Sequence, residues 1–205
     1  MLLAFLSAWA GMASGAEISL LLSGSDGKPL ENAVAYVTSV GTPATGTPKP
    51  AEIDQVNKTF VPQVTVVQTG AAVSFPNSDN IRHQVYSFSP PKVFNTKLYS
   101  GRPSEPVVFD KPGVVVLGCN IHDRMVAWVV VVDTPWFART GADGRATLKD
   151  LPAGNYQLRL WHSGLKGEPP GHPLDLAANA RVEHAVQLDA VAAPAVDHGA
   201  HGAGT

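Results

Sequence analysis

Apolar and polar positions alternate along most of this chain, and the spacing of apolar residues typical of helices is nearly absent. Apolar side chains recur at two-residue steps through residues 18–22 and again through residues 156–161. A period of two places such side chains on one face of a β-strand. Turn signals rich in Gly, Asp, Asn and Pro separate the alternating stretches, as between residues 23 and 27. The pattern predicts an all-β chain of short strands.

The expected strands either alternate in this way or are short apolar runs bounded by turn residues. They cover residues 18–22, 33–38, 64–68, 72–75, 84–88, 107–109, 114–117, 126–132, 146–148, 156–161 and 181–188. Short strands at this spacing are typical of β-sandwiches and barrels. The Pro, Gly and Thr of residues 42–50 predict a linker. Residues 191–205 are rich in Ala, Pro, Gly and His without periodicity, which predicts a disordered tail.

Length and charge narrow the classes of function. The 205 residues include 15 Lys and Arg against 17 Asp and Glu, so the chain is close to charge balance. No basic stretch is dense enough to predict nucleic-acid binding. The length permits one large or two small domains, with ample apolar residues for a core.

The first 16 residues are apolar or small and resemble the hydrophobic region and cleavage site of a secretory signal. This run is too short to span a bilayer as a mature anchor, and no later apolar stretch is long enough. We therefore expect a signal peptide over residues 1–16 and no integral membrane segment after its cleavage. The expected destination is the periplasm of a Gram-negative bacterium.

Cys119 is the only cysteine, so an intramolecular disulfide is impossible. A free thiol is at risk in an oxidising compartment, and metal ligation would protect it. His122 and Met125 follow Cys119 at three-residue steps, just after the valine-rich run of residues 114–117. Thiolate, imidazole and thioether together form a soft ligand set that suits copper.

Blue-copper sites use two His, one Cys and a weak axial Met, so the loop of residues 119–125 lacks only the second His. His83 can supply it, because it follows residues 75–82 at the end of an extended segment. The ends of neighbouring strands can lie side by side in a sandwich. We therefore predict one copper ion per chain, with the ligands His83, Cys119, His122 and Met125.

Each of these residues taken singly has a plainer interpretation. A lone cysteine is usually a small buried hydrophobe and a lone methionine is usually core filler, but their joint spacing at a junction of strand and loop favours a metal site. Zinc fits less well, since its protein sites use Cys, His and carboxylate rather than a thioether. A nucleophilic Cys119 is also disfavoured, because a catalytic thiolate must stay free to attack. We expect no enzymatic activity.

Other polar and aromatic residues have weaker signals. Asn77 is a candidate donor to the thiolate, although Asn is equally common in plain turns. The histidines outside the metal site, including those of the tail, are expected to be structural or solvated. A core or interdomain position is expected for the large aromatic residues Trp136, Phe137 and Trp161.

Residues 51–133 resemble a complete cupredoxin of the plastocyanin and amicyanin kind. The resemblance is carried by Gln55-x-Asn57-x-x-Phe60-x-Pro62, residues 66–70, Val73-x-Phe75-x-Asn77 leading to His83, Phe109-x-x-Pro112-Gly113 and the Cys119 loop. The C-x-x-H-x-x-M spacing is similar to that of amicyanin. Over its full length the chain resembles bacterial proteins labelled methylamine utilization proteins. The cupredoxin resemblance implies a Greek-key β-sandwich that carries single electrons with type 1 copper.

The flanking segments resemble a different module, the transthyretin-like or carboxypeptidase-regulatory-like β-sandwich. Residues 24–35 are similar to its first hairpin and residues 140–156 to its middle strands. Neither flank holds enough strands to bury a core alone. We therefore expect a discontinuous domain of residues 17–47 plus 134–190. The copper domain, residues 51–133, would be inserted between the second and third strands of that domain.

Two features depart from the cupredoxin pattern. Gln84 follows the first ligand, where the family commonly has an Asn that ties the two ligand loops together. Asp123 and Arg124 stand where amicyanin-like proteins have Pro and an apolar residue, so we expect a charged surface beside His122. A polar rim would suit a weak, fast encounter with a charged partner.

The sequence thus predicts a periplasmic type 1 copper protein that passes single electrons to and from a transient redox protein partner. A copper-trafficking or sequestration protein would use the same ligands without a redox partner. A third interpretation is an adhesive or carbohydrate-binding sandwich in which the copper site is structural.

Overall fold

The computed structural model describes residues 15–40, 46–103, 105–165, 167 and 171–189. Within these residues every regular element is a β-strand, so the predicted all-β class is confirmed. No described segment forms a helix long and apolar enough to cross a membrane. The expected tail, residues 1–14 of the expected signal peptide and residues 42–45 of the expected linker lie outside the described residues.

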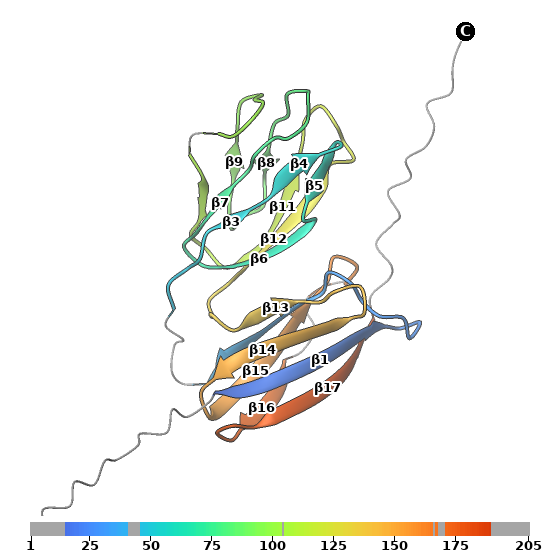
Figure 1. Cartoon of the computed structure of the whole chain (residues 1–205), viewed down its shortest axis with the longest axis vertical. Helices are drawn as coiled ribbons and strands as arrows, with labels where there is room; N and C mark the ends of the chain where they lie inside the picture. Colours follow the sequence, from blue (N-terminus) through green and yellow to red (C-terminus); the bar gives the residue numbers. More distant parts are fainter. Residues whose placement is uncertain (1–14, 41–45, 104, 166, 168–170, 190–205) are drawn as a thin grey trace, which may run out of the picture.

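The middle of the chain forms the upper part of the molecule in Figure 1, coloured cyan to yellow. One of its sheets has the strand order β10-β7-β3, a second has the order β6-β12-β11-β8-β9, and β4 pairs with β5 in a hairpin. These strands are β3 (Ala51–Glu52), β4 (Asp54–Val56), β5 (Thr59–Val61), β6 (Val64–Gln68), β7 (Ala71–Ser74), β8 (Tyr86–Ser87), β9 (Phe94–Asn95), β10 (Val107–Phe109), β11 (Gly113–Gly118) and β12 (Val126–Val132).

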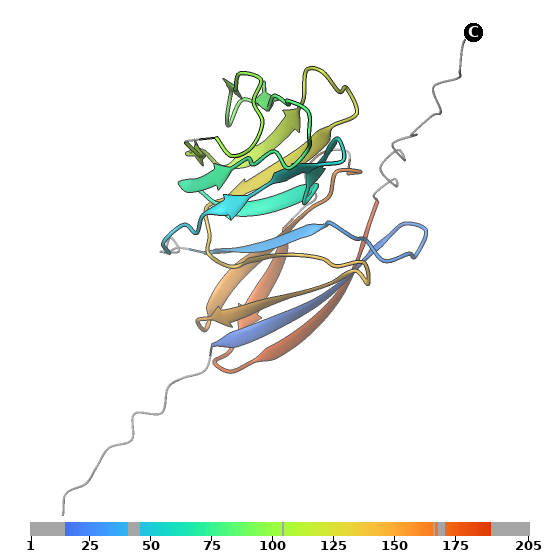
Figure 2. The same ribbon diagram turned by 45° about the horizontal axis from the view of Figure 1, so that its top comes forward.

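The two ends of the described chain come together in the lower part of the molecule, where β1 lies beside β14 and β17 (Figures 1 and 2). Its two sheets have the strand orders β14-β1-β17 and β13-β2-β15-β16. Strand β1 is antiparallel to β14 and parallel to β17. The strands are β1 (Ala16–Gly24), β2 (Val34–Ser39), β13 (Phe137–Arg139), β14 (Arg145–Leu151), β15 (Gly154–Trp161), β16 (His172–Leu176) and β17 (Arg181–Leu188).

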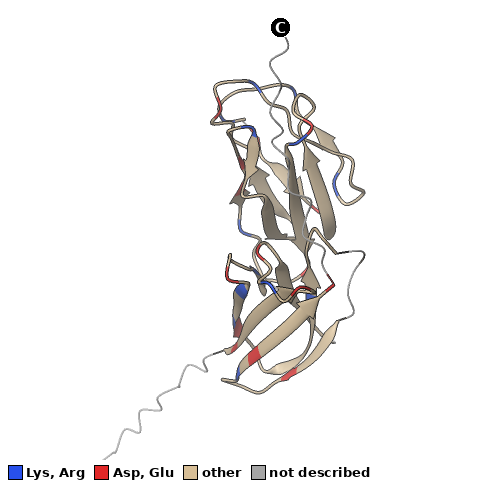
Figure 3. Ribbon diagram, turned by 90° about the vertical axis from the view of Figure 1, so that its right-hand side faces the viewer, with Lys and Arg blue, Asp and Glu red and all other residues tan. Residues whose placement is uncertain are grey.

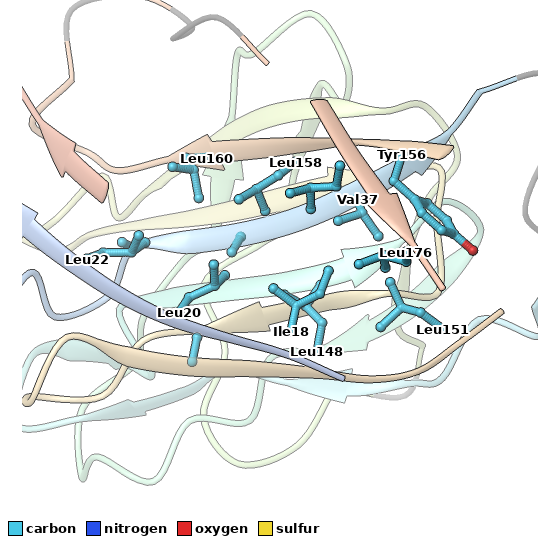
Figure 4. Packing of buried hydrophobic residues seen from close by; sticks show 14 of the residues in the cluster. Ile18, Leu20, Leu22, Val37, Leu148, Leu151, Tyr156, Leu158, Leu160 and Leu176 are labelled. Atoms are coloured by element: carbon cyan, nitrogen blue, oxygen red, sulfur yellow. The ribbon is translucent and has the colours of Figure 1, made fainter. Parts of the chain in front are cut away.

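The core of the lower part contains side chains from both flanks of the sequence (Figure 4). Ile18 and Leu20 of β1 are buried in one cluster with Leu158 and Leu160 of β15. Their two-residue spacing is the alternation that the sequence shows. Because β1 and β2 are interior strands of their sheets, the N-terminal flank completes both sheets of the lower part.

The chain leaves the lower part and returns to it at neighbouring points. A Cβ placed on Gly46 would lie 2.9 Å from Cβ of Pro135. The residue after Pro135 also contacts the lower part, because the Val37 amide of β2 donates a hydrogen bond to the Trp136 carbonyl at 3.1 Å. The ends of the intervening segment therefore meet. The expected domain division stays a prediction, since only the separated parts can show whether each folds by itself.

A third apolar cluster joins the upper and lower parts. It buries Val34 of β2 against Val64, Val130 and Val132 of the upper part. The rings of Trp128 and Trp161 lie across this junction with their centroids 6.4 Å apart. Phe137 and Trp161 pack on this cluster and Trp136 packs on the lower core, so the structural role expected for these aromatic residues is confirmed.

Charged side chains are scattered over both parts of the molecule (Figure 3). Lys and Arg are interspersed with Asp and Glu along the strands and loops in this view. This agrees with the near balance of 15 Lys and Arg against 17 Asp and Glu in the sequence.

Candidate metal centre

The loop of residues 119–125 joins the antiparallel strands β11 and β12 at the end of the upper part that is remote from the lower part. Two turns shape it. The His122 amide donates to the Cys119 carbonyl at 3.3 Å, and the Met125 amide donates to the His122 carbonyl at 2.9 Å. Cys119 and Met125 are buried in the core of the upper part, whereas His122 is partly exposed. Each three-residue step of the motif thus corresponds to one turn.

His83 reaches the same place from the segment before β8. Two backbone hydrogen bonds, each 2.9 Å long, pair it with Tyr99, and the residue is fully buried. Tyr86, at the start of β8, is paired with Gly118, the last residue of β11. The pairing of β8 with β11 therefore brings His83 beside Cys119.

Three of the four expected ligands converge in the structure. Donor atoms of His83, Cys119 and His122 all lie within 4.8 Å of one another. Nδ1 of His83 is 3.6 Å from Sγ of Cys119. The two imidazole rings are inclined at 57°, with centroids 5.0 Å apart. Met125 lies in the same buried cluster as Cys119.

The state of His122 favours ligation. Burial lowers the pKa of its imidazole, and the proximity of His83 and Lys58 lowers that pKa further. A neutral imidazole is the form that binds metal. Nδ1 of His122 is buried and has no hydrogen-bond partner among the described residues. A buried polar atom without a partner costs about 1–3 kcal/mol, which a bound metal would offset.

These observations show that the site fits a metal ion. A sulfur and two imidazole nitrogens converge in a buried position, and one of the nitrogens is otherwise unsatisfied. Among the described residues, this is the one group of three or more His, Cys, Asp or Glu side chains with such spacing. His162, His172 and His184 lie in the lower part and are not brought to the site.

Asp79 is a residue of this site that the sequence analysis did not single out. Its Oδ2 lies 2.7 Å from Nε2 of His83. Burial alone would raise the pKa of the Asp79 carboxyl, but hydrogen bonds from Lys58, His83 and Asn57 outweigh it and lower the pKa. The four-residue spacing between Asp79 and His83 is the one feature of the sequence that could have indicated this contact. It brings the two side chains together only in the loop conformation that the structure shows.

Asn77 does not play the role considered for it. Its side-chain amide donates to the carbonyls of Ile81 and Tyr99 at 2.9 and 2.8 Å, so both N–H groups are used away from the thiolate. Its Oδ1 accepts from the Asp79 amide at 3.0 Å. Of the two roles considered for Asn77, that of a donor to the thiolate is wrong and that of a turn residue is confirmed, because this loop needs the amide to satisfy its own backbone.

Gln84 also acts within its own half of the site. Its amide donates to Oδ1 of Asn95 and to the Thr96 carbonyl. It therefore fastens the segment of His83 to residues 95–96, and the loop of residues 119–125 is not its partner in these bonds. Beside His122, the side chains of Ile121, Asp123 and Arg124 are exposed, which gives a mixed apolar and charged rim.

No family model and no curated protein matches the chain, but several solved structures are similar to it. A Cu-containing nitrite reductase from Thermus scotoductus SA-01 is 26% identical with a TM-score of 0.39, over 46% of this chain and 25% of the reductase chain. A purple cupredoxin from Nitrosopumilus maritimus is 23% identical with a TM-score of 0.36, over 40% of this chain and 99% of the cupredoxin chain. Pseudoazurin from Methylobacterium extorquens AM1 is 26% identical with a TM-score of 0.34, over 42% of this chain and 76% of the pseudoazurin chain.

The matched share of the nitrite reductase is only a quarter of that protein, and the TM-scores are low throughout.

Proposed function

We propose that the chain is a periplasmic type 1 copper protein that carries single electrons between redox partners. The proposed ligands are His83, Cys119, His122 and Met125. Copper bound there would supply a one-electron couple between Cu(II) and Cu(I). The observation that carries the proposal is the buried, unpartnered Nδ1 of His122 in a cluster whose donor atoms lie within 4.8 Å of one another.

The chemistry of the donors favours copper over other metals. Cys119 offers a soft sulfur and the two histidines offer borderline nitrogens, a combination typical of blue-copper sites. A thioether such as that of Met125 is not a usual zinc ligand. The single cysteine supports one such site per chain.

The protein holds these ligands in place before any metal binds. His83 is fixed by its backbone pairing with Tyr99 and by Asp79. Cys119 directly follows the last residue of β11, and the two turns of its loop fix the residues up to β12. Ligands held on rigid elements move little when the charge of the centre changes, which suits rapid electron transfer.

We propose an electron carrier rather than an enzyme. Three strong donors and one weak donor complete a type 1 centre, which leaves no position for a substrate. His122 is the ligand with partial exposure, so a partner would approach at its side. The charged residues Asp123 and Arg124 on that rim suit a transient encounter with a redox protein.

A copper-trafficking protein is the second candidate, because the same soft ligands can hold copper for transfer. The two functions differ in what happens to the metal. A carrier of electrons should be reduced rapidly and reversibly by a small one-electron mediator and should retain copper throughout. A trafficking protein should instead release Cu(I) readily to a competing chelator. Stopped-flow reduction and chelator competition on the same copper-loaded sample separate them, and slow reduction with rapid release would contradict the proposal.

Replacing Met125 by leucine should tune the site without emptying it. The thioether is the weak ligand, so Met125→Leu should still bind copper at one ion per chain, while His83, Cys119 and His122 hold the metal. The reduction potential should rise, because a donor that helps to stabilise Cu(II) has been removed. Copper analysis and voltammetry measure both effects. Loss of copper in this variant would show that Met125 is a dominant ligand and that the proposed hierarchy is wrong.

A further inference from the structure

We infer that Asp79 is a positioning residue that sets the reduction potential of the metal centre through His83, an inference that rests on the proposed function. The carboxylate contacts Nε2 of His83, and Nδ1 of the same ring faces Cys119. Asp79 itself is not a ligand. It acts on the metal through one imidazole ring.

The contact is short and largely shielded from water. Oδ2 of Asp79 lies 2.7 Å from Nε2 of His83, and the exposed fractions of the two side chains are 11% and 0%. Water is largely excluded from such a pair, so the interaction is screened much less than one at the surface. A change of charge at Asp79 should therefore be felt strongly by the imidazole.

A tight turn on another element holds the carboxylate in position. The turn between β4 and β5 consists of Asn57 and Lys58, whose φ angles of 52° and 60° lie in the left-handed region. Such angles at both central residues are typical of two-residue hairpin turns. The Asn57 amide donates to Oδ1 of Asp79 at 2.6 Å, and the Lys58 amide donates to Oδ2 at 2.8 Å.

This arrangement anchors the carboxylate and keeps its charge. The two turn amides are neutral donors, and among the described residues no Lys or Arg side chain forms an ion pair with Asp79. The negative charge therefore remains directed at His83. The hairpin, the loop of residue 79 and the ligand form one continuous chain of hydrogen bonds.

Two consequences follow for the metal. A carboxylate acceptor keeps the proton of His83 on Nε2, so that Nδ1 is free to bind metal on the side of Cys119. The same hydrogen bond makes the imidazole a stronger donor. A stronger donor stabilises the more highly charged Cu(II) more than Cu(I), so the Asp79 carboxylate should lower the potential.

Asp79→Asn tests this with minimal change of shape. The amide oxygen can still accept from Nε2 of His83 and from the Lys58 amide, so the pair with His83 loses mainly its charge, while the hydrogen bond from the Asn57 amide is lost because an NH2 group cannot accept it. We expect the affinity for Cu(II) to fall about tenfold while the affinity for Cu(I) changes little. A tenfold loss of affinity for Cu(II) relative to Cu(I) corresponds to a rise in reduction potential of about 59 mV for one electron. Voltammetry of the copper-loaded protein measures it.

Asp54→Asn is the matched control. Asp54 is also a carboxylate that fastens this loop, because it accepts from the Ser78 amide at 3.2 Å and from the Ser78 hydroxyl at 2.7 Å. The substitution Asp54→Asn removes the same charge as Asp79→Asn, at a carboxylate that does not contact the ring of His83. Its potential shift should be clearly smaller than that of Asp79→Asn. Equal shifts, or no shift in Asp79→Asn, would overturn the inference.

A second readout does not depend on copper. In the metal-free protein, nitrogen-15 NMR should find the proton of His83 on Nε2, with a downfield and slowly exchanging resonance that moves upfield in Asp79→Asn. If that resonance is present but the wild type forms no copper–thiolate band, the proposed function fails although the Asp79–His83 contact stands. The inferred effect of Asp79 on the reduction potential is then overturned together with the proposed function. If His83 carries its proton on Nδ1 in the metal-free wild type, the inference is overturned whatever copper does.

Discussion

Replacing Cys119 by serine should remove the intense visible absorption of the copper-loaded protein completely. The band is expected to arise from charge transfer between a cysteine thiolate and Cu(II), and Cys119 is the only cysteine. Serine has nearly the same shape but offers a hard oxygen that copper binds less well than sulfur. The side chain is buried in the upper core, so the substitution should alter the metal site more than the packing. Visible absorption and copper analysis give the result.

Two controls make this result specific. Far-UV circular dichroism should show that Cys119→Ser retains the β-sheet spectrum. His172→Gln removes a histidine at the start of β16, remote from the site, and should keep both copper and colour. An undiminished band in Cys119→Ser would show that the absorption has another origin and that Cys119 is not the ligand.

Excising the upper part should leave a lower part that folds cooperatively. Residue 46 lies beside residue 135, where a Cβ on Gly46 would be 2.9 Å from Cβ of Pro135, so a short Gly-Ser linker can join the two. The joined chain keeps the interior strands β1 and β2 of both lower sheets. It should melt at a lower temperature than the full chain, because Val34 and Trp161 lose the valines that cover them. Circular dichroism against temperature measures both the cooperativity and the shift.

The complementary fragments sharpen this test. Residues 134–190 alone lack β1 and β2, so open edges and an apolar face would remain and no cooperative transition is expected. Residues 51–133 alone contain both ligand loops and a core of their own, and they should fold and bind copper. A sloping, non-cooperative melt of the joined chain would mean that the flanks do not form a domain and that the insertion is wrongly assigned.

The ligand loop was predictable because its chemistry is local. The steps of three residues from Cys119 to His122 and Met125 are visible in the sequence, and the structure closes each step with one turn. The pairing of His83 with this loop was an inference from strand ends, and the pairing of β8 with β11 provides it. Period-two alternation likewise located β1 and β15.

Other features depend on contacts that no local pattern records. Strand β12 does not alternate, because one of its faces covers the upper core and the other covers the junction with the lower part. Strand β9 pairs with β8 over two residues, too short for a periodic signal, and β8 itself covers only residues 86–87 of the strand expected over residues 84–88. Strand β16 contains Pro173 and is an edge strand, where the missing amide is tolerated. Asp79 meets His83 only because a distant hairpin turn anchors its carboxylate.

The most direct test of the central claim is the visible spectrum of the wild-type protein loaded with Cu(II), followed through one cycle of reduction and reoxidation. Four ligands of the proposed kind should bind one copper ion per chain and give an intense thiolate-to-copper band. One electron per chain should bleach this band, and reoxidation should restore it with the copper still bound. A copper-loaded wild type that is colourless, or that loses its metal on reduction, would contradict the account.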